Sequence, residues 1–291
     1  MRQRWIKLLK LSLKHRILLA GRQSGRMAAR MEKLMKTTLE LYNGEVKLEF
    51  DSFRHVYTLL PEGRKIPSVT TILSVINKPA LISWSANMAV DYVQANLRPG
   101  QSLDELQINS LLKEARIAHT KRRDETADLG SIVHSWISQY IKGEKPEMPI
   151  NQQLQDSINN FLTWQKEHDV KFILSEQPVF SKVHGYCGTL DFVAEIGKEL
   201  FLGDIKTSNA IYDEHWIQLS SYGIARQEEF PIEKYKHQGI IRIGRDGSFE
   251  FKMANNIDKC FEAFLHAKGL WEWQQFMKEE YFKEKERKNE A

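Results

Sequence analysis

The chain has 291 residues, of which 42% are hydrophobic and 27% are charged, and these values exclude both a fully disordered chain and a fibrous repeat. No uninterrupted apolar stretch approaches the roughly 20 residues that a membrane-spanning helix needs. The two cysteines, Cys187 and Cys260, are too few for a cysteine-rich zinc site, a four-cysteine iron–sulfur cluster or a disulfide scaffold, so we expect a reducing compartment.

The net charge of +4 is unevenly distributed along the chain. Residues 1–31 contain nine Lys and Arg and no acidic residue, so the remainder has 33 basic and 38 acidic residues and carries −5. The positive net charge is therefore no indication that the body binds nucleic acid. Trp5, Leu8 and Leu13 recur near helical spacing in the basic segment. We interpret that segment as a solvated extension; a membrane-surface anchor and a mitochondrial-type presequence are the alternatives.

The pattern along the chain predicts an α/β (α+β) fold. We expect a basic extension over 1–36 and a single domain over 37–291, with N-terminal strands and helices at 45–123, a core at 124–253 and a C-terminal helix at 257–285. The first part of this domain is predicted to begin with strands at 45–60, which turn near 51–54, followed by a short helix capped by Ser68. Helices are then predicted at 80–97, 102–117, 124–142 and 151–168. The rest is predicted to contain strands at 171–181, 187–196 and 199–207, a helix at 212–228, and a hairpin at 235–253 that turns at 246–247. This order favours a mixed sheet flanked by helices, with a helical N-terminal part and a long C-terminal helix.

The segment from Gly188 to Ser208 contains the residues most typical of a chemical site. Two strand-like runs flank Gly197-Lys198, which suits a two-residue hairpin turn. If Ile196 faces Glu199, Asp191 falls opposite Asp204, with Cβ atoms about 5 Å apart.

Two carboxylates facing each other repel unless a cation lies between them. Asp204 and Lys206 share one strand face, and the carbonyl of Ile205 between them could add an oxygen ligand. Such hard oxygen ligands favour Mg²⁺ or Mn²⁺. The alternative is a surface salt-bridge cluster, which the apolar runs around these residues disfavour.

Several motifs occur in an order that resembles a known family. The order is His134, Glu176, Gly188-x-x-Asp191, Asp204-Ile205-Lys206 and Gln218-x-x-x-Tyr222, preceded by PSVTTIL at 67–73. It resembles the PD-(D/E)xK nuclease superfamily in its RecB-like exonuclease branch, and is similar to mitochondrial genome maintenance exonuclease-like and phage relatives over roughly residues 45–245.

This resemblance implies a restriction-endonuclease-like core. It also implies that His134, Asp191 and Asp204 bind the metal ion and that Lys206 lies beside the scissile phosphate. Gln218 and Tyr222 would line the path of the DNA. Some relatives carry four cysteines for an iron–sulfur cluster; this chain has two, so we expect no cluster.

Other positions keep two interpretations. Ser68 and Thr70, at a helix N-terminus, could hold a backbone phosphate or simply cap the helix. Glu176 could belong to the site or be an ordinary surface residue, and His134 could be a core histidine. Gln218 and Tyr222 could serve only to pack their helix on the sheet.

Together these observations predict a Mg²⁺- or Mn²⁺-dependent deoxyribonuclease. We expect a single-stranded DNA exonuclease that acts at a free end in repair, replication or recombination, with DNA as its partner and no membrane span. The alternatives are an endonuclease or flap nuclease on the same fold, and a catalytically silent DNA-binding accessory module. We expect a cytoplasmic protein of bacterial or phage type, or a mitochondrial one if residues 1–31 act as a presequence.

Overall fold

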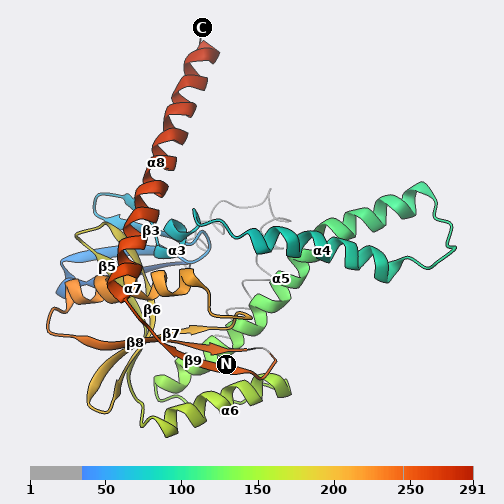
Figure 1. Cartoon of the computed structure of the whole chain (residues 1–291). Coiled ribbons are helices and arrows are strands. Elements are labelled where there is room, and N and C mark those ends of the chain that lie inside the picture. Colours follow the sequence, from blue (N-terminus) through green and yellow to red (C-terminus); the bar gives the residue numbers. More distant parts are fainter. Residues whose placement is uncertain (1–34, 245, 291) are drawn as a thin grey trace. The chain divides into compact units, whose positions relative to one another are not determined.

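The computed structural model describes residues 35–244 and 246–290 (Figure 1). The interpretation of residues 1–31 as a basic extension therefore lies outside the described residues. The chain divides into two compact units at the junction between Pro67 and Ser68, and each unit is described by itself. The prediction that 37–291 acts as a single nuclease domain stays a prediction.

The first unit is a four-stranded antiparallel sheet in the order β1-β2-β3-β4. Its elements are β1 (Lys36–Leu41), the 3₁₀ turn η1 (Tyr42–Gly44), β2 (Val46–Asp51), β3 (Val56–Leu60) and β4 (Arg64–Ile66). The strands β2 and β3 and the turn between them were predicted. Asp51 Oδ1 fixes that turn by accepting the backbone N–H groups of Phe53 and Arg54, both at 2.9 Å.

The second unit is built on a five-stranded mixed sheet in the order β5-β6-β7-β8-β9. Its helices are α3 (Val69–Leu73), α4 (Pro79–Asn96), α5 (Glu105–Ile141), α6 (Gln152–Glu167), α7 (Asp213–Glu229) and α8 (Ile257–Glu290); its strands are β5 (Lys171–Ser181), β6 (Tyr186–Ile196), β7 (Glu199–Lys206), β8 (Tyr235–Ile243) and β9 (Phe249–Met253). Strands β7 and β8 are parallel and are connected through α7, whereas the other neighbours are antiparallel.

Helices cover both faces of this sheet, because side chains of each strand alternate between two apolar clusters. On one face, Leu219 of α7 and Phe264 of α8 pack with Leu202 of β7. On the other face, Ile137 of α5 and Phe161 of α6 pack in a cluster with sheet residues such as Phe201. The predicted α/β class, with a mixed sheet flanked by helices and a long C-terminal helix, is confirmed (Figure 1).

One helix differs from its prediction. Residues 102–117 and 124–142 were expected to form two helices, but 105–141 form the single helix α5. The stretch 118–123 contains no Gly or Pro to interrupt it. Asp104 starts the helix, accepting the N–H of Gln107 in a capping box. Across the described residues, no helix combines the length and apolarity that crossing a membrane requires.

Candidate functional site

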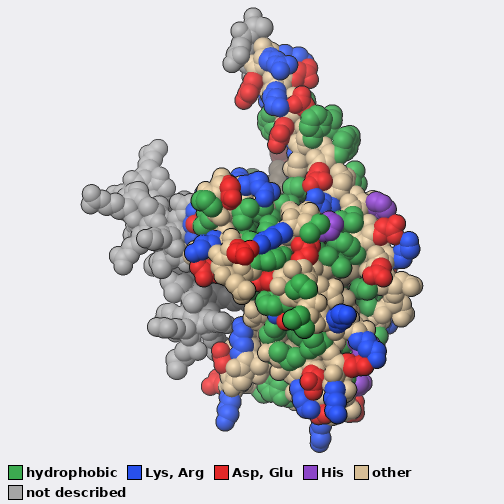
Figure 2. Space-filling model, turned by 90° about the vertical axis from the view of Figure 1, so that its left-hand side faces the viewer, with side chains coloured by type: hydrophobic (Ala, Val, Ile, Leu, Met, Phe, Trp, Pro, Cys, Tyr) green, Lys and Arg blue, Asp and Glu red, His purple; other side chains and the backbone are tan. Residues whose placement is uncertain are grey.

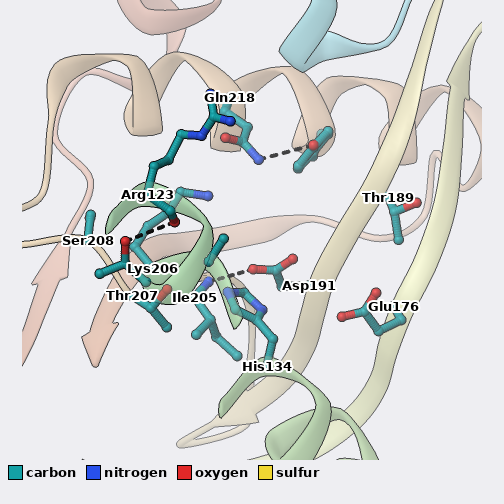
Figure 3. Close-up of a pocket in the computed structure, with 13 residues that line it drawn as sticks. Arg123, His134, Glu176, Thr189, Asp191, Ile205, Lys206, Thr207, Ser208 and Gln218 are labelled. Atoms are coloured by element: carbon teal, nitrogen blue, oxygen red, sulfur yellow. Dashed lines mark hydrogen bonds between the residues drawn. The ribbon is translucent and has the colours of Figure 1, made fainter. Parts of the chain in front are cut away.

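A cavity of about 580 Å³ opens in the second unit where β5, β6 and β7 meet α5 and α7 (Figure 3). Its walls are formed by Arg123, Thr126, Ala127, His134, Glu176, Thr189, Asp191, Ile205, Lys206, Thr207, Ser208, Gln218 and Tyr222. Seven residues singled out in the sequence thus meet in one place, although they come from five different elements. Ile205 is among them, but the role of its carbonyl stays a prediction.

The register of the β6–β7 hairpin explains why Asp191 reaches this cavity. The strands pair from Ile196–Glu199 to Phe192–Gly203, as the assumed turn at Gly197-Lys198 requires. The pairing ends there, one step before Asp191 and Asp204 would pair. Asp191 Oδ2 instead accepts the backbone N–H of Ile205 at 2.7 Å, which fixes its carboxylate at the end of the hairpin.

Three potential metal ligands converge beside that carboxylate. One ligand atom each from His134 on α5, Glu176 on β5 and Asp191 on β6 lies within 4.8 Å of the other two. Carboxylate oxygens and an imidazole nitrogen at this spacing suit a divalent cation such as Mn²⁺ or Mg²⁺. This cluster differs from the predicted set of His134, Asp191 and Asp204, because Glu176 lies in the cluster and Asp204 does not.

Glu176 reaches the cluster through an unusual backbone conformation. Its neighbours pair as Ser175–Phe192 and Gln177–Leu190, which places Glu176 across from Asp191. Glu176 itself has φ 53°, in the left-handed region that non-glycine residues rarely adopt. Backbone strain of this kind is retained mainly where a site needs it, so it is a second indication that the position is functional.

Asp204 is completely buried next to Lys206. Lys206 Nζ lies 2.6 Å from Asp204 Oδ2, but apart from this ion pair neither carboxylate oxygen of Asp204 has a hydrogen-bond partner among the described residues. Burial raises the pKa of Asp204 to about 6; Lys206 acts in the opposite direction, and Asp191 raises the value further. A buried carboxylate with so little compensation fits a site that a cation completes.

The other two carboxylates also resist ionisation. Burial raises the pKa of Asp191, while Lys206 and the Ile205 N–H oppose the shift. The side chain of Glu176 is accessible to solvent, but it is surrounded by the other walls of the cavity. Loss of solvation there, together with the negative charge of Asp191, raises the pKa of Glu176 to about 7. Three acidic groups therefore crowd a region that Lys206 only partly neutralises. The donor set present in this chain fits a divalent metal ion.

Two glycines let the walls of the cavity approach one another. A Cβ atom on Gly188 would lie 2.5 Å from Cε1 of Tyr222. The ring of Tyr222 on α7 can therefore lie against the backbone of β6 only if position 188 is glycine. A Cβ on Gly130 of α5 would lie 2.4 Å from Oγ1 of Thr207. Gln218 Nε2 donates to the Tyr222 hydroxyl at 3.1 Å, which orients both side chains on one side of the cavity.

Arg123 is a cavity residue that the sequence analysis missed. In Figure 3 its side chain extends toward Gln218, on the side of the cavity away from Glu176. The signal was present, because Arg123 precedes His134 by 11 residues, which is close to three helical turns and places both on one face of a continuous helix. The predicted break at 118–123 obscured that relation.

Ser68 and Thr70 do not line this cavity. Ser68 Oγ accepts the N–H of Thr71 at 3.1 Å and lies 3.0 Å from Thr70 Oγ1. Ser68 is thus the N-cap of the five-residue helix α3, which agrees with the simpler of its two interpretations.

The comparisons with known proteins do not assign a family. No family model matches the sequence, and no curated protein matches it. A solved structure described as "Crystal structure of SSO0001" is similar to this chain at 13% sequence identity with a TM-score of 0.27, covering 63% of this chain and 86% of the other. A likeness this weak carries no argument about fold or function.

Proposed function

We propose that the chain is a Mg²⁺- or Mn²⁺-dependent deoxyribonuclease that hydrolyses phosphodiester bonds, with single-stranded DNA as its main substrate. The observation that carries the proposal is the cluster of His134, Glu176 and Asp191 with Lys206 in the same cavity. Phosphodiester hydrolysis requires an activated water and stabilisation of extra negative charge on the phosphate. Metal-ligating groups next to a lysine offer both.

His134, Glu176 and Asp191 would hold the metal ion, with the carboxylate of Asp204 nearby. When bound, the ion would supply Lewis-acid polarisation of the phosphate and a water of lowered pKa. Lys206 would stabilise the negative charge that develops on the phosphate oxygens. Its side chain is only 16% exposed and is held by Asp204, so little reorganisation is needed during the reaction.

The remaining cavity residues would position the DNA strand. Arg123 can form two parallel hydrogen bonds to a phosphate, and Ser208 is a further polar residue in the walls of the cavity. Gln218 presents an amide and Tyr222 an aromatic ring. These groups can contact the sugars and bases of DNA whatever its base sequence. We propose that the strand passes from the metal ligands toward Arg123.

Digestion of single-stranded DNA tests this proposal and its alternatives. Linear end-labelled and circular strands are incubated with Mg²⁺, Mn²⁺ or EDTA, using wild type and Asp191→Asn. We expect metal-dependent release of nucleotides from linear DNA only, and none from the variant. Cleavage of the circle would indicate an endonuclease. Binding without any metal-dependent cleavage would indicate the silent accessory module and refute the proposed activity.

A further inference from the structure

Helix α5 continues outward from the cavity for about five turns beyond Arg123. In Figure 1 this outer half of the helix lies beside α4 and away from the five-stranded sheet. Helix α4 packs against one side of it, where Ala115 is buried and the ring centroids of His119 and Trp84 of α4 lie 6.4 Å apart. Arg116 is exposed. The outer half of α5 therefore has one side against α4 and another side that faces solvent.

The solvent-facing side of α5 that carries Arg116 is in line with the cavity. At about 100° per residue, Arg116 and His134 project in the same direction, and Arg123 projects within about 20° of both. Along the helix axis, Arg116 lies about 10 Å from Arg123, which in turn lies about 17 Å from His134. Arg123 and His134 are walls of the cavity. The side of α5 with Arg116 is thus a direct continuation of the cavity wall.

The charges of α5 are sorted around this line. Between Arg116 and the C-terminal end of α5, and for one turn before Arg116, the acidic residues all project about 100° or more away from Arg123: Glu114, Asp124, Glu125 and Asp128. Arg122 lies off the line on the other side and contacts Glu125 at 3.6 Å. Arg116 forms no ion pair with a described residue. On the face of the molecule shown in Figure 2, by contrast, basic and acidic side chains are intermixed. The line from the cavity to Arg116 is therefore suited to an anionic chain.

We propose that Arg116 is a second phosphate-binding residue, which contacts the backbone of a single DNA strand after the strand has left the cavity past Arg123. This inference rests on the proposed function and extends the bound strand beyond the cavity. An exposed arginine without a carboxylate partner can bind a phosphate through two parallel hydrogen bonds. A contact with the phosphate backbone holds the strand whatever its base sequence.

The position of Arg116 sets the length of strand that the protein holds. Along the helix axis, about 27 Å separates Arg116 from His134 at the metal ligands. Stacked nucleotides follow one another at about 3.4 Å, so this span corresponds to about eight nucleotides of a stacked strand and to fewer of a stretched one. A long strand contacts both the cavity and Arg116, whereas a remnant of two or three nucleotides contacts the cavity alone. An exonuclease that shortens its substrate should therefore lose the Arg116 contact once about eight nucleotides or fewer remain.

Fluorescence anisotropy of a labelled oligothymidylate of about 20 nucleotides, in EDTA, tests the contact without cleavage. Arg116→Gln should raise the dissociation constant of the full chain about tenfold and lower the slope of log affinity against log salt by about 0.7. Arg122→Gln is the matched control, because it removes the same charge from a different side of the same helix, and it should change neither quantity. Far-UV circular dichroism verifies that both variants are folded. If Arg116→Gln binds as tightly as wild type, or if both variants weaken binding equally, the proposal is wrong.

The ladder of products formed with Mn²⁺, at strand concentrations below the dissociation constant, tests the length. Wild type should shorten the strand rapidly and slow down when about eight nucleotides or fewer remain, whereas Arg116→Gln should be slow at every length. A variant whose rate falls at the same length as that of wild type overturns the role of Arg116. A wild type that binds the strand but never cuts it refutes the proposed function instead, and the binding measurement in EDTA still decides whether Arg116 contacts the strand.

Discussion

Replacing Asp191 by asparagine should stabilise the metal-free protein and abolish its response to metal. The carboxylate of Asp191 lies close to Glu176 and interacts with the carboxylate of Asp204, and Lys206 is the cation that lowers the pKa of both aspartates. The asparagine side chain has nearly the volume of the native aspartate and can still accept the Ile205 N–H through its oxygen. The substitution therefore removes a charge while leaving the hydrogen bond in place.

The magnitude follows from the pKa of Asp204. Its folded value of about 6, against 3.8 for the free side chain, means that the folded state binds a proton more tightly than the unfolded state. Stability is then lost as the pH rises from about 4 to about 6, by about 3 kcal/mol in total. Burial is the largest cause of the raised pKa of Asp204, and the negative charge of Asp191 contributes a smaller part. We expect Asp191→Asn to recover about 1 kcal/mol above pH 6, or about 2–4 °C in melting temperature, and little at pH 4.

Thermal melts in EDTA and in Mn²⁺ or Mg²⁺ measure both effects. Metal at 100 times its dissociation constant should stabilise the wild type by about 2.7 kcal/mol, because only the folded site binds it. The variant should gain much less, so the order of the two melting temperatures reverses on adding metal. Asp128→Asn, an exposed position on α5, is the control. A variant that melts several degrees lower in EDTA, with equal metal shifts in both proteins, would show that Asp191 is structural.

Three further predictions concern the reaction and its substrate. Lys206→Ala should lower the rate of hydrolysis at least about 100-fold, since it removes a charge that stabilises the transition state. Arg123→Gln should raise KM for DNA about tenfold and flatten its salt dependence by about one unit of slope, with kcat nearly unchanged, because a lost phosphate contact weakens binding uniformly. Deleting residues 1–30 should leave turnover at saturating DNA unchanged, although the net charge falls from +4 to −5.

Each of the two substitutions has a control variant. Lys171→Ala removes an exposed lysine that pairs with Asp169 outside the cavity, and it should retain full activity. Arg122→Gln changes the residue next to Arg123 that does not line the cavity. Near wild-type turnover in Lys206→Ala contradicts its assignment. If Arg122→Gln and Arg123→Gln change KM equally, Arg123 contributes only to the general positive charge of the surface. If the truncated chain is inactive, the basic segment is required for activity.

The hairpin that carries the site could be predicted from the sequence because its signals are local. A two-residue turn at Gly197-Lys198 fixes the register, and a period of two along the strand places Asp204 and Lys206 on one face. In the sequence, Gly188 stood out only by its spacing of three residues from Asp191. The reason for it, the ring of Tyr222 lying against its backbone, requires knowing how α7 crosses the sheet.

Glu176 and Arg123 could not be assigned from local patterns. The alternation of side chains between the two faces of a strand does not predict which way Glu176 of β5 points. Its left-handed backbone conformation departs from the regular strand geometry on which that alternation depends. Arg123 depends on the continuity of α5 over 37 residues. A charged stretch without Gly or Pro predicts continuation of a helix more strongly than its polarity predicts a break.

The spacing of Asp204 and Lys206 acquires a physical reason once both are placed. A lysine beside a reacting phosphate is effective only if its ammonium is already aimed before charge develops. The buried carboxylate of Asp204 lies 2.6 Å from that ammonium and leaves it exposed on the cavity side. Without Lys206, Asp204 would be a buried acid that lacks its adjacent cation and would take up a proton more readily still. We therefore interpret Asp204 first as the group that positions Lys206. Its predicted role as a metal ligand stays a prediction, as does that of Glu176.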